Sequence, residues 1–210
     1  MDQNTANKII EELNKNYPDA KCELNHGNSF QLLIAVMLSA QCTDIRVNIV
    51  TEELFNNCSK PEDIISLGKE ELERIIKPCG FYKNKSRNIL ETCQKLIDIY
   101  SGNVPNNFEQ LISLPGVGRK TANVVLSVAF DIPTIPVDTH VFRVSNRIGL
   151  VDAKDPEETE QQLMNIIRKE DWIRAPHLLI FHGRRACSAR NPKCKLCNIF
   201  NYCYFTKRTL

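Results

Sequence analysis

Apolar residues recur at intervals of three and four along most of the chain, and the strict alternation that is typical of strands does not occur. This spacing predicts helices at several places: residues 4–16, from Ser29 to about Gln41, from Asp44 through Leu54, 82–100, and from Trp172 to Phe181. Ser59 and Glu62 form a predicted capping box around Pro61, and Gly68 and Gly80 punctuate two short helices. The pattern therefore predicts an all-α fold.

The stretch from Leu114 to Ala122 lies between two of these helical patterns and has glycine at 116 and 118. Both glycines allow a positive φ and leave backbone N–H groups uncovered by side chains. A helix begins near Arg119, and amides that open a helix form a seat for phosphate. Lys120 lies in the first turn of this helix, beside the predicted anion site and not on a solvated flank. It is either a phosphate clamp or a nucleophile.

Two prolines, at 133 and 136, favour an extended connection, so residues 131–136 are the best candidate for an internal boundary. Beyond them, Asp138 is predicted to cap a helix that contains Val141, Val144 and Ile148, and Pro156 opens another helix. A lysine is a nucleophile only when it is neutral, so Lys120 would need desolvation or a nearby base. Asp138 could be that base, or it could be a plain helix cap.

The composition is that of an ordinary soluble globular protein, with 42% hydrophobic and 25% charged residues among 210. This length fits one large domain or two small ones. The longest apolar run, Leu32 to Leu38, is far too short for a membrane span. The first residues are polar and lack a signal-peptide pattern, so we expect a cytoplasmic protein.

The net charge of +2 conceals a basic cluster near the C-terminus. Such a cluster suits a nucleic-acid-binding face, although a solvated surface is the alternative. Its members are Arg184, Arg185, Arg190, Lys193, Lys195, Lys207 and Arg208.

Nine cysteines without an export signal argue against a disulfide framework. Five are scattered and are expected to be ordinary buried thiols: Cys22, Cys42, Cys58, Cys79 and Cys93. The other four are separated by gaps of six, two and five residues: Cys187, Cys194, Cys197 and Cys203. Four thiolates can hold zinc or a [4Fe-4S] cluster, and their single-file spacing favours the cluster. The ordered loop would also present Arg190 and Lys193 to a phosphate backbone.

Two side chains at helix ends are candidates for contact with nucleic acid. Gln41 follows a buried apolar helix and either caps it or projects into a groove. Phe81 follows Gly80 at the tip of a turn, which is how wedges that unstack bases are presented. Packing of Phe81 onto the core is the alternative.

Together these segments resemble one family, the endonuclease III DNA glycosylases of base excision repair. The resemblance covers essentially the whole chain in the family's order. It rests on LSAQCTD at 38–44, GFYKNK at 80–85, LPGVGRKTANVV at 114–125, VDTHVFRVSNR at 137–147, HGRRAC at 182–187 and the four terminal cysteines. The chain departs from the family at Cys42, where alanine or threonine is commoner, and at Phe81, where leucine is commoner.

The resemblance implies two helical lobes with DNA between them. Residues 22–132 would form a six-helix barrel that contains the helix-hairpin-helix at about 108–130. Residues 1–21 and 133–210 would form the other lobe, with a [4Fe-4S] cluster loop at 187–203. The expected partner is double-stranded DNA containing damaged pyrimidines or abasic sites, bound by a monomer that is cytoplasmic and nucleoid-associated, without membrane contact.

The resemblance also implies a mechanism. Lys120 would attack C1′ of a flipped nucleotide and form a Schiff base, Asp138 would stabilise the positive charge, and β-elimination would nick the strand 3′ to the lesion. Gly116 and Gly118 would bind phosphate, and Gln41 and Phe81 would fill the gap in the duplex. Further DNA contacts are expected from Arg119, His140, Arg190 and Lys193.

Two other interpretations remain open at this point. The related mismatch adenine glycosylases share the hairpin, the aspartate and the cluster, but lack a lysine at this place. A noncatalytic DNA-binding module with a zinc knuckle would use the same hairpin without cutting DNA.

Overall fold

The computed structural model describes residues 1–205, and these residues form helices and no strand. The predicted all-α fold is therefore confirmed. The chain divides into two compact units. The central unit is Glu23–Asp131, and the terminal unit combines Met1–Cys22 with the chain from Ile132 onward. The predicted limits, 22 and 132, differ from these by one residue.

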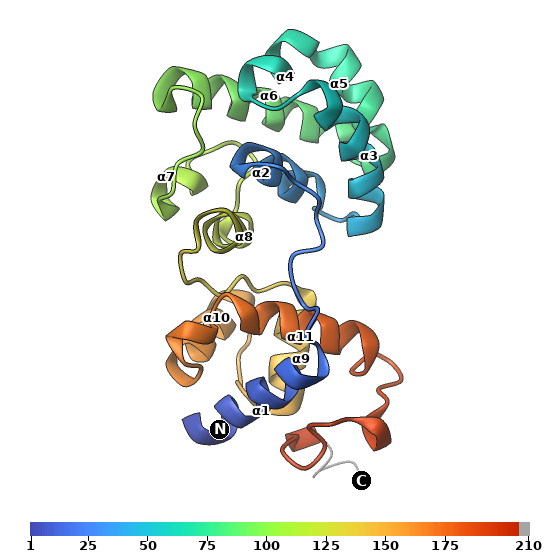
Figure 1. Ribbon diagram of the computed structural model, residues 1–210, viewed down its shortest axis with the longest axis vertical. Coiled ribbons are helices and arrows are strands. Elements are labelled where there is room, and N and C mark those ends of the chain that lie inside the picture. The colour runs from blue at the N-terminus through green and yellow to red at the C-terminus, as the bar shows by residue number, and fades with distance from the viewer. Residues whose placement is uncertain (206–210) are drawn as a thin grey trace. The chain divides into compact units, whose positions relative to one another are not determined.

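The central unit is organised around one apolar helix. Every residue of α2 from Phe30 to Leu38 is buried, and α2 packs on α8, while the long α6 packs on α4 and α5 (Figure 1). The elements of this unit are α2 (Ser29–Leu38), α3 (Asp44–Asn57), α4 (Pro61–Leu67), α5 (Lys69–Ile76), η1 (Lys77–Cys79), α6 (Tyr82–Tyr100), α7 (Phe108–Ile112) and α8 (Arg119–Phe130).

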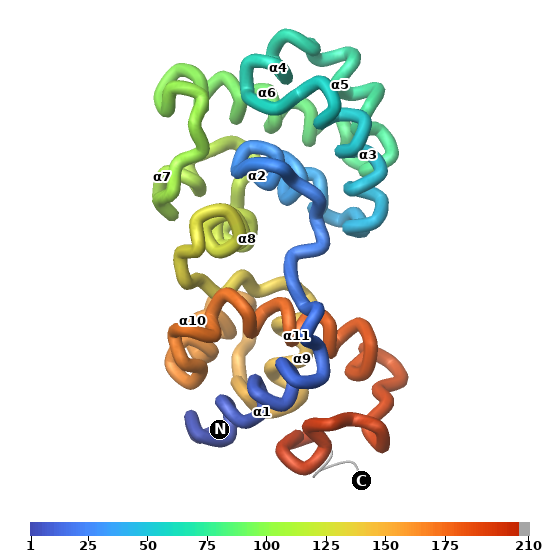
Figure 2. Tube along the Cα trace, in the orientation of Figure 1, coloured from blue at the N-terminus to red at the C-terminus, as the bar shows by residue number. Residues whose placement is uncertain are grey.

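The terminal unit joins the two ends of the chain. Helix α1 packs on α11, which also packs on α9, so the blue N-terminal helix shares a core with orange and yellow segments (Figure 2). The elements of this unit are α1 (Gln3–Asn16), α9 (Thr139–Ile148), α10 (Pro156–Ile166), η2 (Lys169–Asp171), α11 (Arg174–Arg185) and η3 (Cys194–Leu196).

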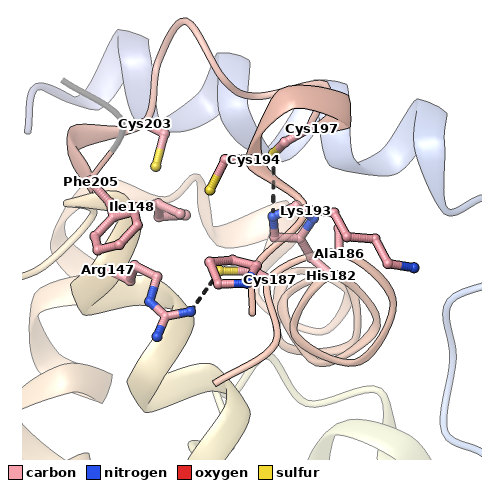
Figure 3. Close-up of a pocket in the computed structure, with 11 residues that line it drawn as sticks. Arg147, Ile148, His182, Ala186, Cys187, Lys193, Cys194, Cys197, Cys203 and Phe205 are labelled. Carbon is pink, nitrogen blue, oxygen red and sulfur yellow. Dashed lines mark hydrogen bonds between the residues drawn. The ribbon is translucent and has the colours of Figure 1, made fainter. Parts of the chain in front are cut away.

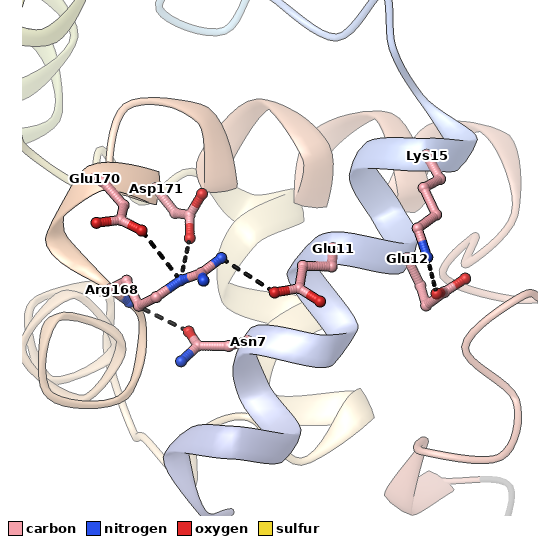
Figure 4. A network of polar contacts seen from close by, with 7 residues as sticks. All are labelled: Asn7, Glu11, Glu12, Lys15, Arg168, Glu170 and Asp171. Carbon is pink, nitrogen blue, oxygen red and sulfur yellow. Dashed lines mark hydrogen bonds and ion pairs between the residues drawn. The ribbon is translucent and has the colours of Figure 1, made fainter.

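Within the terminal unit, two arginines connect α1 and the segment after it to the C-terminal part of the chain. Arg168 pairs with Asp171 at 3.0 Å and with Glu11 at 3.3 Å (Figure 4), and these pairs are exposed enough to contribute little. The guanidinium of Arg174 donates to the carbonyl oxygens of Pro18 at 2.8 Å and Tyr17 at 3.2 Å, and also to that of Ala20. Arg174 is therefore the stronger of the two ties.

Three predicted element ends were wrong. Helix α2 stops at Leu38 and not near Gln41, because the chain turns after Ser39, whose hydroxyl donates to the Val36 carbonyl at 2.8 Å. Ser59 and Glu62 do not form a capping box. Instead, the carboxylate of Asp63 accepts hydrogen bonds from the backbone N–H groups of Ser59 and Lys60 at 2.8 and 3.1 Å, so the box lies one residue later.

The last long helix runs from Arg174 to Arg185, later than the predicted 172–181. Trp172 follows the short η2 turn and precedes α11. The basic residues in the last turn of α11 interact favourably with the negative end of the helix dipole. Among residues 1–205, no helix is both long and apolar enough to span a membrane.

Candidate functional site

The hairpin between α7 and α8 uses its two glycines for different reasons. Gly116 has φ +75°, and a Cβ there would lie 2.8 Å from Cβ of Asn88, so both conformation and space require glycine. Gly118 has φ −95° and is the N-cap of α8, so only Gly116 uses the positive φ that both glycines allow. A Cβ on Gly118 would meet nothing within 4 Å. Neither packing nor backbone conformation therefore explains glycine at 118.

Two side chains of helix α6 donate hydrogen bonds to this hairpin. The hydroxyl of Thr92 donates to the carbonyl of Pro115 at 2.8 Å, and Nζ of Lys95 donates to that of Ser113 at 2.7 Å. These bonds satisfy hairpin carbonyls that have no partner of their own in a helix. Neither contact was predicted from the sequence.

Lys120 and Arg119 lie in the first turn of α8, as predicted, and both are exposed. The exposure of Lys120 contradicts the expectation that it lies off any solvated flank. The guanidinium of Arg119 lies 5.2 Å from the centre of the Phe108 ring, which steadies it across the hairpin.

Gln41 and Phe81 are both exposed, and both have left-handed backbone conformations with φ of 54° and 49°. This conformation costs a residue other than glycine about 1–2 kcal/mol. The Phe81 side chain is 64% exposed, so the alternative in which it packs on the core is excluded. Exposed side chains on strained turns are typical of functional sites.

Asp138 caps α9, as predicted. Its Oδ1 accepts a hydrogen bond from the Val141 N–H at 2.8 Å, and its side chain is half-buried. His140 follows in the first turn, with Nδ1 3.2 Å from an Arg143 guanidinium nitrogen. On α11, burial lowers the pKa of His177 to about 4, the charge of Arg174 adds to this, and Asp138 opposes it. Asp138 and His140 belong to the terminal unit, and Lys120 belongs to the central unit.

The four C-terminal cysteines line one pocket, into which their sulfur atoms converge (Figure 3). All four are free thiols, and apolar side chains such as Ile148 and Phe205 complete the walls. Within residues 1–205, no three Cys, His, Asp or Glu side chains are grouped as ligands of a single metal ion. Thiols gathered around an apolar pocket are the donor set that suits an iron–sulfur cluster.

Polar contacts hold the walls of this cysteine pocket. Arg147 donates to Sγ of Cys187 at 3.6 Å and to the carbonyl oxygens of Ser188 and Ala189 at 2.6 and 2.8 Å. Burial raises the pKa of Cys187, and the hydrogen bond from Arg147 opposes that rise. His182 bridges Cys197 at 3.7 Å and the Tyr17 hydroxyl at 3.0 Å. Burial lowers the pKa of His182 to about 4, which keeps its ring neutral near pH 7.

The predicted basic cluster is only partly available for binding. Arg190 and Lys193 are exposed in the loop between the first two pocket cysteines. Arg185, in contrast, pairs with Asp19 at 2.8 Å and lies 4.4 Å from the centre of the Phe181 ring, so it has a structural role. Lys207 and Arg208 lie outside the described residues.

The scattered cysteines are not all buried thiols. Cys58, Cys79 and Cys93 are buried, but Cys22 and Cys42 are half-buried because they lie in connections between helices. One buried cation was also missed. Lys85 has its Nζ 2.8 Å from the Leu38 carbonyl oxygen and 2.9 Å from that of Cys79. The burial of Lys85 could have been predicted, because it lies four residues before Ile89 and therefore on the apolar face of α6.

Comparison with known proteins places the chain in a family. Residues 34–169 match the family described as "HhH-GPD superfamily base excision DNA repair protein". The chain belongs to this family. It is 51% identical to endonuclease III of Rickettsia conorii, over 97% of both chains. It is 43% identical to endonuclease III of Escherichia coli K12, over 96% of this chain and 95% of that one.

The fold has close counterparts among solved structures. A trapped endonuclease III–DNA covalent intermediate matches with a TM-score of 0.93 and 49% identity, over 99% of this chain and 98% of that one. A thermostable thymine-DNA glycosylase has a TM-score of 0.85 at 21% identity, over 97% of each chain, which reflects the fold alone. The predicted family, and the enzyme class of DNA glycosylase with AP lyase activity, are confirmed by these relatives.

Proposed function

We propose that the chain excises oxidised pyrimidines from double-stranded DNA and then nicks the strand 3′ to the abasic site, with Lys120 as the covalent nucleophile. The observation that carries this proposal is the place of Lys120 in the first turn of α8, two residues after Gly118. The trapped covalent DNA intermediate of a 49% identical endonuclease III supports a covalent route.

The amides at the start of α8 are proposed to seat a DNA phosphate. Gly118 offers no side-chain cap to these amides, and open space surrounds the position of its absent Cβ. A glycine that neither φ nor packing demands is suited to close approach by an outside group. A phosphate held there would bring the neighbouring nucleotide to Lys120.

The chemistry requires a neutral lysine. Lys120 is exposed in the protein alone, so the desolvation must come from the DNA that covers it. Nζ then attacks C1′ of the flipped nucleotide, the bond from C1′ to the base breaks, and the base leaves with the electron pair and a proton. The bond from C1′ to the ring oxygen then opens, the ring oxygen takes a proton, and the nitrogen lone pair forms the C=N bond of the Schiff base. In the β-elimination a proton leaves C2′, the C3′–O bond breaks, and the 3′ phosphate departs with the electron pair.

Asp138 is proposed to stabilise the positive charge that develops on the sugar and to take part in proton transfer. The hydrogen bond that it accepts from the Val141 N–H fixes the position of the carboxylate. Proximity of Asp138 to Lys120 in the working complex is part of this proposal, since the two residues belong to different units.

The two strained turns are proposed to occupy the duplex where the nucleotide leaves. Phe81 offers a large exposed ring that can wedge between base steps, and Gln41 offers an amide that can pair with the orphaned base. Arg119, His140, Arg190 and Lys193 are proposed to contact the DNA around this point.

Cys187, Cys194, Cys197 and Cys203 are proposed to hold a [4Fe-4S] cluster in the cysteine pocket. When bound, the cluster supplies a structural cross-link, because four cysteine ligands leave no open position for substrate. Arg147 and His182 then orient the loop that presents Arg190 and Lys193. Metal and sulfide analysis of the purified protein should find four iron atoms and four acid-labile sulfides per chain. Zinc in their place would refute the proposed cluster. The protein is proposed to act as a cytoplasmic, nucleoid-associated monomer.

Borohydride trapping on duplex DNA containing thymine glycol tests the reaction. The wild-type chain should give a covalent complex, and Lys120→Gln should give none. Lys8→Gln, an exposed lysine on α1, is the matched control and should trap like the wild type. An undiminished complex with Lys120→Gln, or none with the wild type, would refute the mechanism and favour a binding module.

Asp138 is tested by two substitutions that separate charge from capping. Asp138→Asn keeps an N-cap side chain and removes the charge, so base excision should fall while stability stays within about 0.5 kcal/mol. Asp138→Ala removes both and should also cost about 1 kcal/mol of stability. Full excision activity in Asp138→Asn would mean that the residue is only a helix cap.

A further inference from the structure

Lys85 is buried, with 9% of its surface exposed, and it holds the backbone of both strained turns of the central unit. Its Nζ donates to the carbonyl oxygen of Leu38 at 2.8 Å and to that of Cys79 at 2.9 Å. Its backbone N–H donates to the carbonyl oxygen of Phe81 at 3.0 Å. One residue therefore fixes the chain just before Gln41 and on both sides of Gly80.

The first of these turns begins at the end of α2. Leu38 is the last residue of α2, which has no basic residue in its own last turn. Carbonyl groups at a helix C-terminus lack partners within the helix and form the negative end of its dipole, where a cation is favourable. Lys85 supplies that cation from α6. A hydrogen bond from the Cys42 N–H to the Ser39 carbonyl at 3.0 Å closes the turn, so little freedom remains between Leu38 and Gln41.

The second turn leads from η1 into α6. Gly80 and Phe81 have left-handed φ values of 70° and 49°, and Phe81 is the N-cap of α6. Its carbonyl oxygen accepts hydrogen bonds from the N–H groups of Asn84 and Lys85 at 3.1 and 3.0 Å. Because Phe81 is 64% exposed, contacts with the core do not set the position of its ring. The backbone that Lys85 holds at Cys79 and Phe81 sets it instead.

A lysine is not the residue that stability alone would favour at position 85. This position shares the apolar face of α6 with Ile89, which is fully buried. An apolar side chain could fill the space without the cost of burying a charge. A buried cation whose hydrogen bonds are made fixes its acceptors relative to one another. The acceptors of Nζ are the carbonyl oxygens that precede the turns of Gln41 and Phe81.

We propose that Lys85 is a positioning residue for nucleotide flipping, which sets the separation of the Gln41 and Phe81 turns. This inference rests on the proposed function, in which Gln41 and Phe81 enter the duplex. Lys85 acts through the backbone, since its buried side chain faces carbonyl oxygens of the protein. Without its ammonium group, each turn keeps its own hydrogen bonds and loses its link to the other. Binding energy is then used to order the turns before the nucleotide leaves the stack.

The first test compares single-turnover excision of thymine glycol from two duplexes. In one the lesion is paired with adenine, and in the other it lies at the centre of three consecutive mismatches. Flipping costs less for a mismatched base than for a paired one, so the second duplex depends less on the wedge.

Lys85→Met should excise the paired lesion about 10–100-fold more slowly than the wild type, because misplacement by about 1 Å has effects of this size. The loss on the mismatched lesion should be less than about threefold. Affinity for undamaged duplex, which phosphate contacts dominate, should stay within about twofold of the wild type. Equal losses on the two lesions, or wild-type rates on both, would overturn the inference, because Lys85 would then serve only the fold or have no role.

Lys95→Met is the matched comparison on the same helix. Nζ of Lys95 donates to the carbonyl oxygen of Ser113 at 2.7 Å, in the hairpin and outside the two turns, so its loss should slow both substrates by the same factor. Both rates come from one preparation, and their ratio does not depend on the fraction that is folded. Lys85→Gln keeps a neutral donor one bond nearer the backbone, and it should show the same selective loss if Lys85→Met does not fold.

The second test combines Lys85→Met with Phe81→Ala. Because a ring that is absent cannot be misplaced, the two losses on the paired lesion should not multiply. Losses that multiply would show that the residues act independently and would overturn the inference. A slow Phe81→Ala beside a wild-type-like Lys85→Met would overturn it alone. Full activity of Phe81→Ala would instead refute the proposed role of the wedge, and the inference with it.

Discussion

Gly116→Ala is expected to destabilise the central unit by about 2–5 kcal/mol, because two separate costs add. The φ of +75° places alanine in the left-handed region, at about 1–2 kcal/mol. The new Cβ would also lie 2.7 Å from Nδ2 and 2.8 Å from Cβ of Asn88, which adds overpacking of about 1–3 kcal/mol. The Asn88 Cβ cannot rotate away as the amide can, so α6 or the hairpin must shift.

Urea unfolding followed by circular dichroism measures this loss as a lower midpoint at an unchanged slope. Asn88→Ala introduced into the Gly116→Ala chain removes Nδ2 but keeps a Cβ, so it should recover only part of the overpacking cost, about 1 kcal/mol. Equal stability of Gly116→Ala and wild type would refute the reasoning. Full recovery in the double variant would show that neither the backbone conformation nor the remaining contact with Cβ of residue 88 costs stability.

Gly118→Ala is the matched control in the same hairpin. With φ −95° and no atom within 4 Å of its Cβ, it should change stability by no more than about 0.5 kcal/mol. The added methyl group would nonetheless stand before the amides of α8 and should weaken binding to undamaged duplex DNA about tenfold in a fluorescence titration. Unchanged affinity would show that the phosphate seat lies elsewhere.

Three further perturbations probe the terminal unit. Arg174→Ala should lower the free energy of unfolding by about 2–4 kcal/mol, measured in urea, because it leaves the carbonyl oxygens of Tyr17, Pro18 and Ala20 without their shared donor, and near-wild-type stability would contradict this. Since the pKa of His177 is lowered to about 4, its contribution to stability should be lost as the pH drops from about 6.5 to about 4, by at most about 3 kcal/mol. The lowered pKa of His182 acts in the same range, so His177→Gln should reduce the loss without abolishing it, and an unchanged profile would rule His177 out. Arg147→Met should expose the loop between Cys187 and Cys203 to limited proteolysis, since two of its carbonyl oxygens lose a charged donor, and equal cleavage rates would refute that role.

Features that depend on a few neighbouring residues were predictable from the sequence. The hairpin glycines, the cap at Asp138 and the proline boundary each involve residues within about five positions, and the structure places all three where the pattern indicated. The cysteine spacing likewise indicated one shared pocket. Capping and turn chemistry are local, so their signals are present in short windows of sequence.

Features that depend on packing between distant segments were not predictable in this way. The pattern treated Gly116 and Gly118 alike, because only the position of Asn88 on α6 distinguishes them. It likewise did not predict that Lys85 joins the end of α2 to η1 through the carbonyl oxygens of Leu38 and Cys79. Lys120 was expected to lie beside the anion site and not on a solvated flank, but its side chain is exposed in the structure.

One helix sets the spacing of the features proposed to meet DNA in the central unit. Phe81 is the N-cap of α6, Lys85 follows on its first turn, and Asn88, Thr92 and Lys95 reach the hairpin. Positions 85, 88, 92 and 95 share one helical face and extend over about 15 Å at 1.5 Å per residue. Because a continuous helix resists change in length, the wedge turn and the phosphate seat are held at a fixed separation.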